Sequence, residues 1–476
     1  MTAQVLQVLF ALYIVWVVAA CATLLAERRS PTATLAWILA FVALPVVSGL
    51  YYMVFGPRRM KRRSKRYDRA RRILRRAHEA SDGPPRPALE ADAAGLAAVA
   101  RRLEQGQPTF ASAVSLLHDG DQCAAALEAA IAAARHHVHM EYYIWEPDRT
   151  GTRFRDLLVA AAQRGVEVRV IYDYVGSSSL GAHFWAPLTA AGGEARAFNR
   201  VRLAIASINF ANFRTHRKIA VIDGAVGFVG GINIHDPELP SLSGKAAWRD
   251  LHTRIEGEPV HRLQRLFLEG WNYCRPDFRL SVRNMVQYFP ATRCGEGVAA
   301  QVVASGPDDG NAPLHAFFLA GIASARRRVL IQTPYLIPDE PLESALRVAE
   351  LRGVDVQVIV PRDGDSRIVT AASKTYCDSL RKAGIEVFEY GPPMLHTKTL
   401  VIDDTVGVVG TANMDNRSFR LNFEIAAAFY DRGIIDALVR RFEEDRAASR
   451  AFPLRRRPEK LTALLESLAR LTSPVL

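Results

Sequence analysis

The sequence lacks any pair of cysteines at CxxC spacing, and it has only five cysteines in 476 residues. Sparse, scattered cysteines exclude a disulfide framework and a zinc site, and they are typical of reduced thiols that face a cytosol. Charged residues are not in excess either, because 23% of the residues are charged and 49% are apolar. This balance excludes an intrinsically disordered chain, and the length predicts two or more structural units with buried cores.

Charge is almost absent from the first 56 residues, where two apolar runs extend from Val5 to Ala26 and from Ala33 to Phe55. The first run would form a helix of about 33 Å, enough to cross a hydrocarbon core of about 30 Å. The second run contains Pro45, which is expected to kink it. A cleaved signal peptide and a pair of buried core helices are the alternatives, but no Lys or Arg precedes the first run and the second follows at once. We therefore predict a two-helix transmembrane hairpin over residues 1–56.

Positive charge is concentrated in the run Pro57–Arg76, which holds twelve Lys or Arg and one Asp in a chain with a formal net charge of +12. Basic residues beside a membrane span favour the cytoplasmic side, and they attract anionic lipids. The remaining body is close to neutral, which argues against nucleic acid as a partner. We predict a multi-pass protein of the inner cell membrane with its N-terminus and its body in the cytoplasm. Residues 57–109 are expected to form a basic juxtamembrane segment and a linker.

The body contains an internal duplication. A stretch that reads as a helix followed by a strand, Ala126–Trp145, recurs as Leu314–Ile337, and the strand pattern of Arg164–Asp173 recurs as Arg352–Pro361. Helix and strand alternate, which predicts an α/β fold with a largely parallel sheet. The expected boundaries are a first repeat at 110–285, a connector at 286–299, a second repeat at 300–450 and a tail at 451–476. The tail has apolar residues at helical spacing and is expected to pack on the body in preference to lying on the membrane.

Each repeat contains one copy of a polar motif at the start of a strand-like run. HRKIAVID spans His216 to Asp223, and HTKTLVID spans His396 to Asp403. When both stretches are extended to the Asn that follows, ten of their eighteen positions are identical. One such motif can arise by chance, but two at matching places in a duplicated unit indicate a site to which both repeats contribute.

Strand geometry separates the motif residues into two groups. Residues i and i+2 of a strand share a face. His216 and Lys218 therefore lie on one face, and so do His396 and Lys398. Asp223 and Asp403 have the opposite parity and fall at a turn, where they are expected to fix the hairpin or pair with a charge behind the site. Asn233 and Asn413 follow glycine-containing turns, from which an amide can reach back to the site.

Two imidazoles and two ammonium groups around one point suit a phosphodiester. One neutral imidazole can attack phosphorus while the other, protonated, donates to the departing alkoxide. The lysines and asparagines would hold the non-bridging oxygens, so neither a metal nor any other cofactor is expected. The run His136–His139 is the one tempting ligand set, and its register between helix and strand makes it a poor metal site. The residues leave open which His is the nucleophile, with His216 preferred.

Each imidazole needs a carboxylate to set its tautomer and pKa. Asp250 lies 34 residues beyond His216, and Glu424 lies 28 residues beyond His396. Both distances allow a strand to return, so each acid is expected to pair with the His of its own repeat. The alternative is that both are ordinary surface acids.

The two motifs, HRKIAVID with GGIN and HTKTLVID with GTAN, resemble the paired motifs of the phospholipase D superfamily. Within it the chain is similar to bacterial cardiolipin synthases, notably in MEYYIW, WRDLHTRIEG, QTPYLIPDE and GTANMDNRSFRLNFE. The resemblance covers nearly the whole chain. The superfamily commonly has Ser where this chain has Gly231 and Thr411; Thr keeps the hydroxyl, and Gly is usual in the first motif of cardiolipin synthases.

This resemblance implies two phospholipase D-like α/β repeats that share one active site, and a phosphohistidine intermediate. It assigns catalytic roles to the six residues His216, Lys218, Asp223, His396, Lys398 and Asp403, and supporting roles to Asn233, Asn413, Asp250 and Glu424. The implied reaction transfers a phosphatidyl group from one phosphatidylglycerol to another, giving cardiolipin and glycerol. The main alternative is a phospholipase D-type hydrolase of membrane phospholipids. The sequence does not tell the oligomeric state, or whether phosphatidylethanolamine serves as the second substrate.

Overall fold

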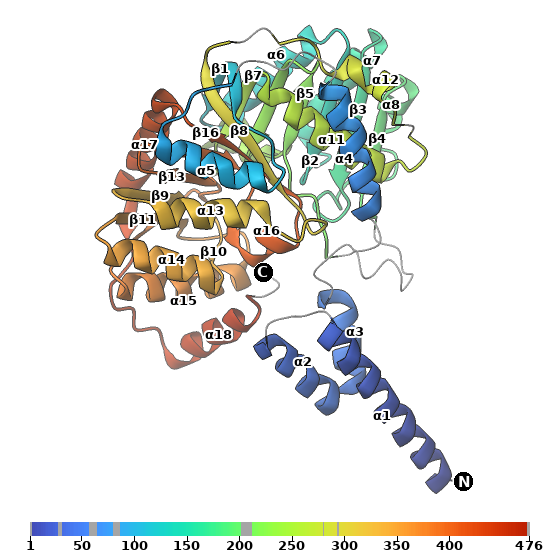
Figure 1. Ribbon diagram of the computed structural model, residues 1–476, viewed down its shortest axis with the longest axis vertical. Coiled ribbons are helices and arrows are strands. Elements are labelled where there is room, and N and C mark those ends of the chain that lie inside the picture. Colours follow the sequence, from blue (N-terminus) through green and yellow to red (C-terminus); the bar gives the residue numbers. More distant parts are fainter. Residues whose placement is uncertain are drawn as a thin grey trace. The chain divides into compact units, whose positions relative to one another are not determined.

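The computed structural model describes residues 2–26, 31–56, 64–79, 86–200, 212–278, 280–292 and 295–473. The chain forms two compact units. The N-terminal unit is made up of residues 1–58 together with 201–212, and the body is made up of residues 59–200 and 213–476. Figure 1 labels most of their helices and strands.

In its described residues, the N-terminal unit contains three apolar helices: α1 (Thr2–Ala26), α2 (Pro31–Ala43) and α3 (Pro45–Phe55). Within the described residues, α1 is the one helix long and apolar enough to cross a membrane. The second predicted span is not one helix, because it ends at Ala43 and resumes at Pro45. A proline ring has no N–H to donate and collides with the carbonyl of the preceding turn, so the helix breaks there.

The chain folds back at this break. The ring of Trp37 on α2 lies 4.9 Å from that of Tyr52 on α3, centroid to centroid. In one continuous helix these residues would stand about 22 Å apart. Helices α2 and α3, of 13 and 11 residues, are about 20 and 17 Å long, and each is too short to cross a hydrocarbon core of about 30 Å by itself.

The body is built on a sheet of fifteen strands in the order β17-β12-β11-β9-β13-β14-β16-β8-β1-β7-β6-β5-β2-β3-β4. The first repeat supplies β1 (Thr109–Leu117), β2 (His137–Tyr142), β3 (Glu167–Asp173), β4 (Glu194–Phe198), β5 (Ile219–Ile222), β6 (Val226–Gly230) and β7 (His252–Gly257). The second supplies β8 (Val298–Ser305), β9 (Arg328–Gln332), β11 (Asp355–Pro361), β12 (Glu386–Tyr390), β13 (Thr399–Ile402), β14 (Val406–Gly410), β16 (Glu424–Phe429) and β17 (Ser449–Ala451). A separate pair joins β10 (Leu336–Ile337) to β15 (Met414–Asp415).

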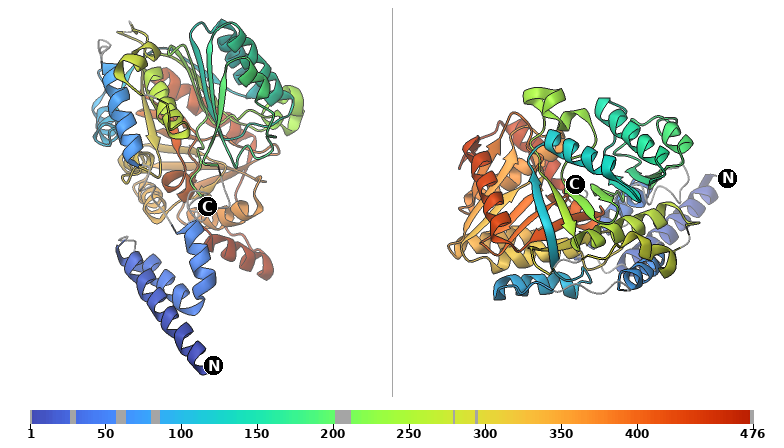
Figure 2. Two further views of the ribbon diagram at one scale, coloured as in Figure 1. Left: turned by 90° about the vertical axis from the view of Figure 1, so that its right-hand side faces the viewer. Right: turned by 90° about the horizontal axis from the view of Figure 1, so that it is seen from above.

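The strand order repeats itself outward from the junction of β1 with β8. Strands β1, β7, β6, β5, β2, β3 and β4 on one side correspond to β8, β16, β14, β13, β9, β11 and β12 on the other. This order is that of two equivalent repeats related by a pseudo-twofold axis, and Figure 2 shows the repeats side by side, the first in green and the second in orange and red.

The sheet is mixed, and the expectation of a largely parallel sheet was wrong. Parallel pairing is confined to β2-β3-β4 and β9-β11-β12, and every other pair in the sheet is antiparallel. The reason is local: a tight turn after each polar motif returns the chain at once, which pairs β5 with β6 and β13 with β14 antiparallel.

Helices cover the sheet on both faces. The first repeat contributes α6 (Gly120–Ala133), α7 (Arg149–Gln163), α8 (Ala186–Ala190), α10 (Pro240–Ser243), α11 (Pro259–Cys274) and α12 (Val282–Met285), with the 3-10 turns η1 (Asp236–Glu238), η2 (Gly244–Ala246) and η3 (Val286–Tyr288). The second contributes α13 (Pro313–Ser324), α14 (Glu340–Leu351), α15 (Arg367–Lys382), α16 (Asn416–Arg420), α17 (Arg432–Ala447) and α18 (Lys460–Leu471).

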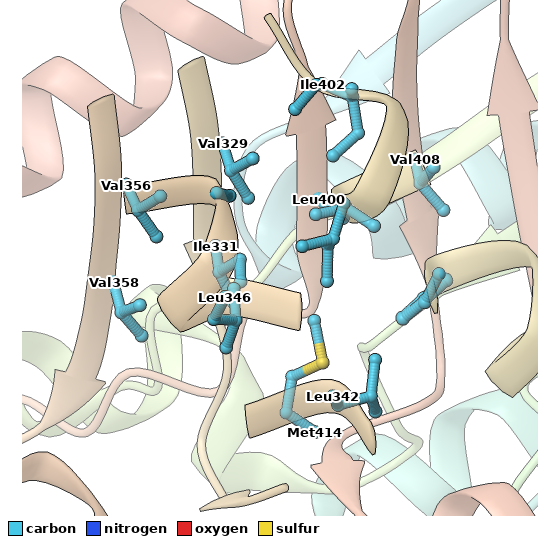
Figure 3. Close-up of a cluster of buried hydrophobic side chains, with 14 of the residues drawn as sticks. Val329, Ile331, Leu342, Leu346, Val356, Val358, Leu400, Ile402, Val408 and Met414 are labelled. Atoms are coloured by element: carbon cyan, nitrogen blue, oxygen red, sulfur yellow. The ribbon is translucent and has the colours of Figure 1, made fainter. Parts of the chain in front are cut away.

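Three apolar layers hold these elements together. Figure 3 shows part of the layer under α13 and α14, where residues such as Val329, Ile331 and Leu400 meet Leu342 and Leu346. An equivalent layer in the first repeat lies beneath α6 and α7. A third layer joins α11 and α17 to strands of both repeats. Because this last core is shared, each repeat supports the position of the other's strands.

The segment expected to be a linker contains two helices, α4 (Ser64–Glu79) and α5 (Ala91–Arg102). Helix α4 packs on α11, with Tyr67 stacked against Tyr273 and Phe423. Arg71 donates to Glu269 of the first repeat (3.3 Å) and to Asp308 of the second (2.7 Å). Helix α4, which contains the described part of the basic run, is thus amphipathic, and its buried face is part of the body.

Candidate active site

The two motifs lie where the repeats meet, and each is bonded to the opposite repeat. The N–H of His216 donates to the carbonyl of Phe423 (2.9 Å), whose own N–H donates to Arg214 (2.9 Å). In the second motif, the N–H of His396 donates to the carbonyl of Arg249 (2.8 Å). Backbone pairing therefore places the residue before each carboxylate beside the His of the other repeat.

The histidines and carboxylates form crossed pairs. Nδ1 of His216 lies 3.1 Å from Oε2 of Glu424, and Nδ1 of His396 lies 2.6 Å from Oδ2 of Asp250. The expectation that each His pairs with the acid of its own repeat was wrong, because backbone bridges between Arg249 and Leu395 and between Thr215 and Phe423 set each acid beside the motif of the opposite repeat. With Nδ1 held by a carboxylate, Nε2 is the nitrogen left for chemistry in both rings.

The two lysines are buried beside the histidines, as the shared face predicts. Nζ of Lys218 donates to the carbonyl of His216 (2.9 Å), and Nζ of Lys398 donates to that of His396. Nζ of Lys398 also lies 3.5 Å from Asp250. Each ammonium is thus fixed two residues along the strand from the imidazole, where it can face the same phosphate.

Burial shifts the pKa values of these groups. It lowers the pKa of His216 to about 4 and that of Lys218 to about 7, and in both cases the positive charge of Lys398 lowers the pKa further. Burial and the charge of Lys398 also lower the pKa of His396. Because a charge of the second motif acts on groups of the first, the two motifs lie in one electrostatic site.

An aromatic ring packs against each imidazole. Tyr143 lies 4.9 Å from the ring of His216, and Trp248 lies 4.8 Å from that of His396, centroid to centroid. The ring of Tyr143 also lies 5.4 Å from Nζ of Lys218. These aromatics were not singled out from the sequence, although Tyr143 sits directly after β2 and Trp248 two residues before Asp250.

Gly231 and Thr411 occupy matching places and support the two acids differently. A Cβ at Gly231 would stand 2.1 Å from an oxygen of Asp250, so any side chain there would displace the carboxylate. The hydroxyl of Thr411 donates to Glu424 (2.5 Å). The first repeat makes room for its acid, and the second fixes its acid with a hydroxyl.

The two asparagines are held differently as well. The Nδ2 of Asn233 donates to Glu238 (3.2 Å), and its Oδ1 accepts from the N–H of Ile144 (3.2 Å). The backbone N–H of Asn413 donates to Ser418 (3.0 Å), while its Oδ1 is buried without a hydrogen-bond partner in the described part of the chain. Asn413 is therefore the better placed of the two to meet a substrate.

Glu238 is a site residue that the sequence reasoning missed. It is buried, and its Oε1 lies 4.0 Å from Nδ1 of His396 and 3.5 Å from Nε2 of His235. Glu238 follows Asn233 by five residues, as Ser418 follows Asn413, and each accepts the N–H of its Asn. A comparison of the two repeats five residues after each Asn would have revealed Glu238 in the first and Ser418 in the second.

Three of these groups could geometrically hold a metal ion. Ligand atoms of Glu238, Asp250 and His396 lie within 4.8 Å of one another. However, Asp250 already shares a proton with Nδ1 of His396 and faces the ammonium of Lys398. This set of side chains therefore suits a shared proton better than a metal ion. In the run His136–His139, Nε2 of His137 and Nδ1 of His139 are hydrogen-bonded to Gln264, and Nε2 of His139 is hydrogen-bonded to Glu167.

The two aspartates of the motifs lie away from this site. Asp223 follows β5, and seven residues of extended chain separate it from His216, about 20 Å. Its carboxylate accepts the N–H groups of Arg135, His136 and His137 at 2.8–2.9 Å. Asp403 accepts those of residues 326–328 in the same way. Both have positive φ, of 54° and 49°. This geometry agrees with a role in fixing the turn, and the catalytic role that the resemblance assigns to the two aspartates stays a prediction.

A scan of family models matches the description "Cardiolipin synthase, PLD-like domain" at residues 127–249 and 318–446, and "Phospholipase_D-nuclease N-terminal" at 14–57. The chain belongs to the cardiolipin synthase family. The chain is 37% identical over 458 residues to a cardiolipin synthase of Alkalihalophilus pseudofirmus, covering 94% of this chain and 90% of that one. It is 36% identical over 463 residues to the major cardiolipin synthase of Bacillus subtilis, covering 94% and 95%.

A solved structure shares the fold. The phosphatidylserine synthase of Haemophilus influenzae superimposes with a TM-score of 0.60 at 15% identity, covering 79% of this chain and all of that one. At this identity the likeness concerns the fold alone. It agrees with the duplicated α/β body, whose two repeats coincide with the two regions matched by the family model.

We expect Asp223→Ala to lower the thermal unfolding midpoint of the detergent-purified protein. The change leaves three backbone N–H groups without a charged acceptor and puts Ala at positive φ, at a cost of about 2–4 kcal/mol. Asp223→Asn should cost less, because an amide oxygen still accepts and Asn tolerates this backbone. Activity lost at an unchanged midpoint would instead place Asp223 in the chemistry.

Proposed function

We propose that this protein joins two phosphatidylglycerol molecules into cardiolipin and releases glycerol. The crossed His–carboxylate pairs support the proposal most, because each holds its imidazole through Nδ1 and leaves Nε2 without a hydrogen bond among the described residues, in one site that also contains the buried Lys218 and Lys398. Phosphodiester exchange needs a nucleophile, a proton donor and positive charge around phosphorus. The site contains all three.

The proposed reaction proceeds in two displacements. Nε2 of one neutral His attacks phosphorus, the bond to the glycerol oxygen breaks, and the other His gives that oxygen its proton. That second His, now neutral, takes the proton of a hydroxyl on another phosphatidylglycerol, whose oxygen attacks the phosphohistidine and frees the first ring. Lys218 and Lys398 stabilise the charge on the non-bridging oxygens in both steps.

We expect His216→Ala and His396→Ala each to lower cardiolipin formation by about 10²–10⁴-fold, because each removes a nucleophile or a proton carrier. The measurement is the lipid product of purified protein in phosphatidylglycerol vesicles with a chelator present. His183→Ala, at an exposed position outside the site, is the matched control. Phosphatidic acid in place of cardiolipin would identify a hydrolase, and phosphatidylethanolamine offered with phosphatidylglycerol tests the second substrate.

The difference between Glu238 and Ser418 favours His216 as the nucleophile. His396 faces two carboxylates, Asp250 and Glu238, whereas Ser418 puts no charge at the equivalent place near His216. Negative charge favours imidazolium, so His396 is the better proton donor.

The charged and titratable groups that act on His216 are Glu424, Lys218 and Lys398. Those that act on His396 are Asp250, Glu238 and Lys398, and His235 faces Glu238. Asp415, near Glu424, has a pKa raised to about 6 by burial.

We expect Glu238→Gln to shift the alkaline limb of the pH–rate profile downward by about 0.5–1 unit. The sign follows because loss of a negative charge lowers the pKa of His396, which must be protonated for the first displacement. The acid limb, set by His216, should stay in place, and Ser418→Ala should move neither limb. A shift of the acid limb alone in Glu238→Gln would reverse the roles of the two histidines.

Helix α1 fits membrane association, and we propose that it is the single crossing, with the body in the cytoplasm. The expected hairpin would put Arg28 and Arg29 outside, opposite the basic run of residues 57–76. Folding back of α3 along α2 supports a different path, in which these basic residues all lie on the cytoplasmic side.

A single crossing predicts that an epitope tag added to the N-terminus is reached by antibody on intact spheroplasts of an expressing cell. A tag at the C-terminus should be reached by antibody only after the spheroplasts are permeabilised, and this tag serves as the control. If both tags require permeabilisation, the chain crosses twice and the hairpin expectation holds.

A further inference from the structure

Helix α18 near the C-terminus is attached to the body by one face. Its Glu466 is buried and accepts from Arg456 at 2.7 and 2.5 Å, and Arg456 also pairs with Asp378 on α15. Ala469 packs against the apolar cluster of Ile337 and Tyr376, and Arg470 lies over the ring of Tyr376 (4.9 Å). The helix is therefore held in a defined rotation about its axis.

The opposite face of α18 is a row of exposed leucines. The row, here called the leucine face, consists of Leu461, Leu464, Leu465, Leu468 and Leu471. Their spacing of three and four residues puts them on one side of a helix. Each is at least 50% exposed, and Leu471 is 76% exposed. A contiguous apolar row of this kind marks a surface that is covered in the working protein.

The end of α18 is bonded to the segment that follows the second motif. The hydroxyl of Tyr376 donates to Oγ of Ser473 (3.1 Å), and Nδ2 of Asn416 donates to the carbonyl of Ser473 (3.2 Å). Asn416 begins α16, three residues after Asn413. Strand β15, between them, pairs with β10, on which α15 also packs. The leucine face thus belongs to the corner of the body that carries the second half of the active site.

Basic residues flank the leucine face. Arg455, Arg457, Lys460 and Arg470 are exposed in this segment, where Glu459 is the exposed acid and Glu466 is buried in its ion pair. A leucine row edged by Lys and Arg matches the boundary between the acyl chains and the headgroups of an anionic bilayer. A second copy of this chain would have to place the same positive charges against each other.

We propose that α18 is an interfacial helix whose leucine face inserts into the surface of an anionic bilayer and holds the active site against it. The inference rests on the proposed function, in which both substrates are lipids of such a bilayer. It assigns the protein a second membrane contact, on the opposite end of the chain from α1. Through Ser473 and Asn416, the depth of this helix in the bilayer sets the height of the site above the lipid phosphates.

The test uses the full chain with its native cysteines replaced by Ala and with one new cysteine, Leu465→Cys. The matched control is Leu351→Cys on α14, at a position that is 83% exposed. Each carries the fluorophore NBD and is reconstituted into vesicles of phosphatidylglycerol and phosphatidylcholine that contain nitroxide-labelled lipid. We expect several-fold stronger quenching at Leu465 than at Leu351. Equal quenching overturns the proposal. So does a Leu465 probe that is shielded from lipid and responds to protein density, since a second copy would then be the occupant.

A second measurement separates this helix from the chemistry. Leu461→Ser, Leu464→Ser and Leu465→Ser combined should raise the apparent KM for phosphatidylglycerol in mixed micelles about tenfold and leave kcat unchanged, because the change weakens surface binding and touches no reacting group. Val348→Ser with Leu351→Ser is the control. A fall in kcat with KM unchanged would contradict the proposal. The quenching assay needs no turnover, so its failure is distinct from failure to form cardiolipin.

Discussion

The site depends on one interaction, the bond between each catalytic imidazole and a carboxylate that belongs to the other repeat. His216 with Glu424 and His396 with Asp250 are buried charge-assisted pairs, which are strong only when both partners are in place. Neither repeat alone fixes the tautomer of its own motif His, because the carboxylate comes from the other repeat. The duplicated body is therefore one catalytic unit, and the apolar layer shared by α11 and α17 keeps its two halves in register.

Sequence reasoning found the elements that repeat and missed those that cross between repeats. The pairing of His216 with Lys218 on one face follows from strand periodicity, and the structure places both beside the site. The partner of each His could not be predicted, because Asp250 and Glu424 stand at similar distances from their own histidines and nothing local favours the opposite repeat. The antiparallel strands were missed for a related reason. Alternation of helix and strand describes only the parallel strands toward each edge of the sheet, whereas the tight turns after the motifs make β5–β6 and β13–β14 antiparallel.

The placement of Asp223 and Asp403 shows how an invariant-looking motif combines two functions. The His and Lys of each motif face the site, and its Asp accepts three backbone N–H groups at the far end of the same strand. The parity of the residues along the strand separates these functions, and it does so from sequence alone. Glu238 escaped notice because it lies outside the motif, in a short turn that only the comparison with Ser418 makes meaningful.

Departures from the pseudo-twofold symmetry have a chemical reason. Two identical imidazole sites would share one proton equally, and neither ring would be reliably the attacker or the donor. Glu238 faces His396, and the residue at the matching offset in the second repeat is the neutral Ser418. We propose that the two rings therefore differ in proton affinity although the backbone around them repeats. In the proposed reaction, water competes with the lipid hydroxyl for the phosphohistidine. The proposed contact with the bilayer, where lipid hydroxyls are concentrated and water is scarce, would give exchange an advantage over hydrolysis. In the proposed mechanism, the asymmetry of the acids therefore acts in the first displacement, and the contact with the membrane acts in the second.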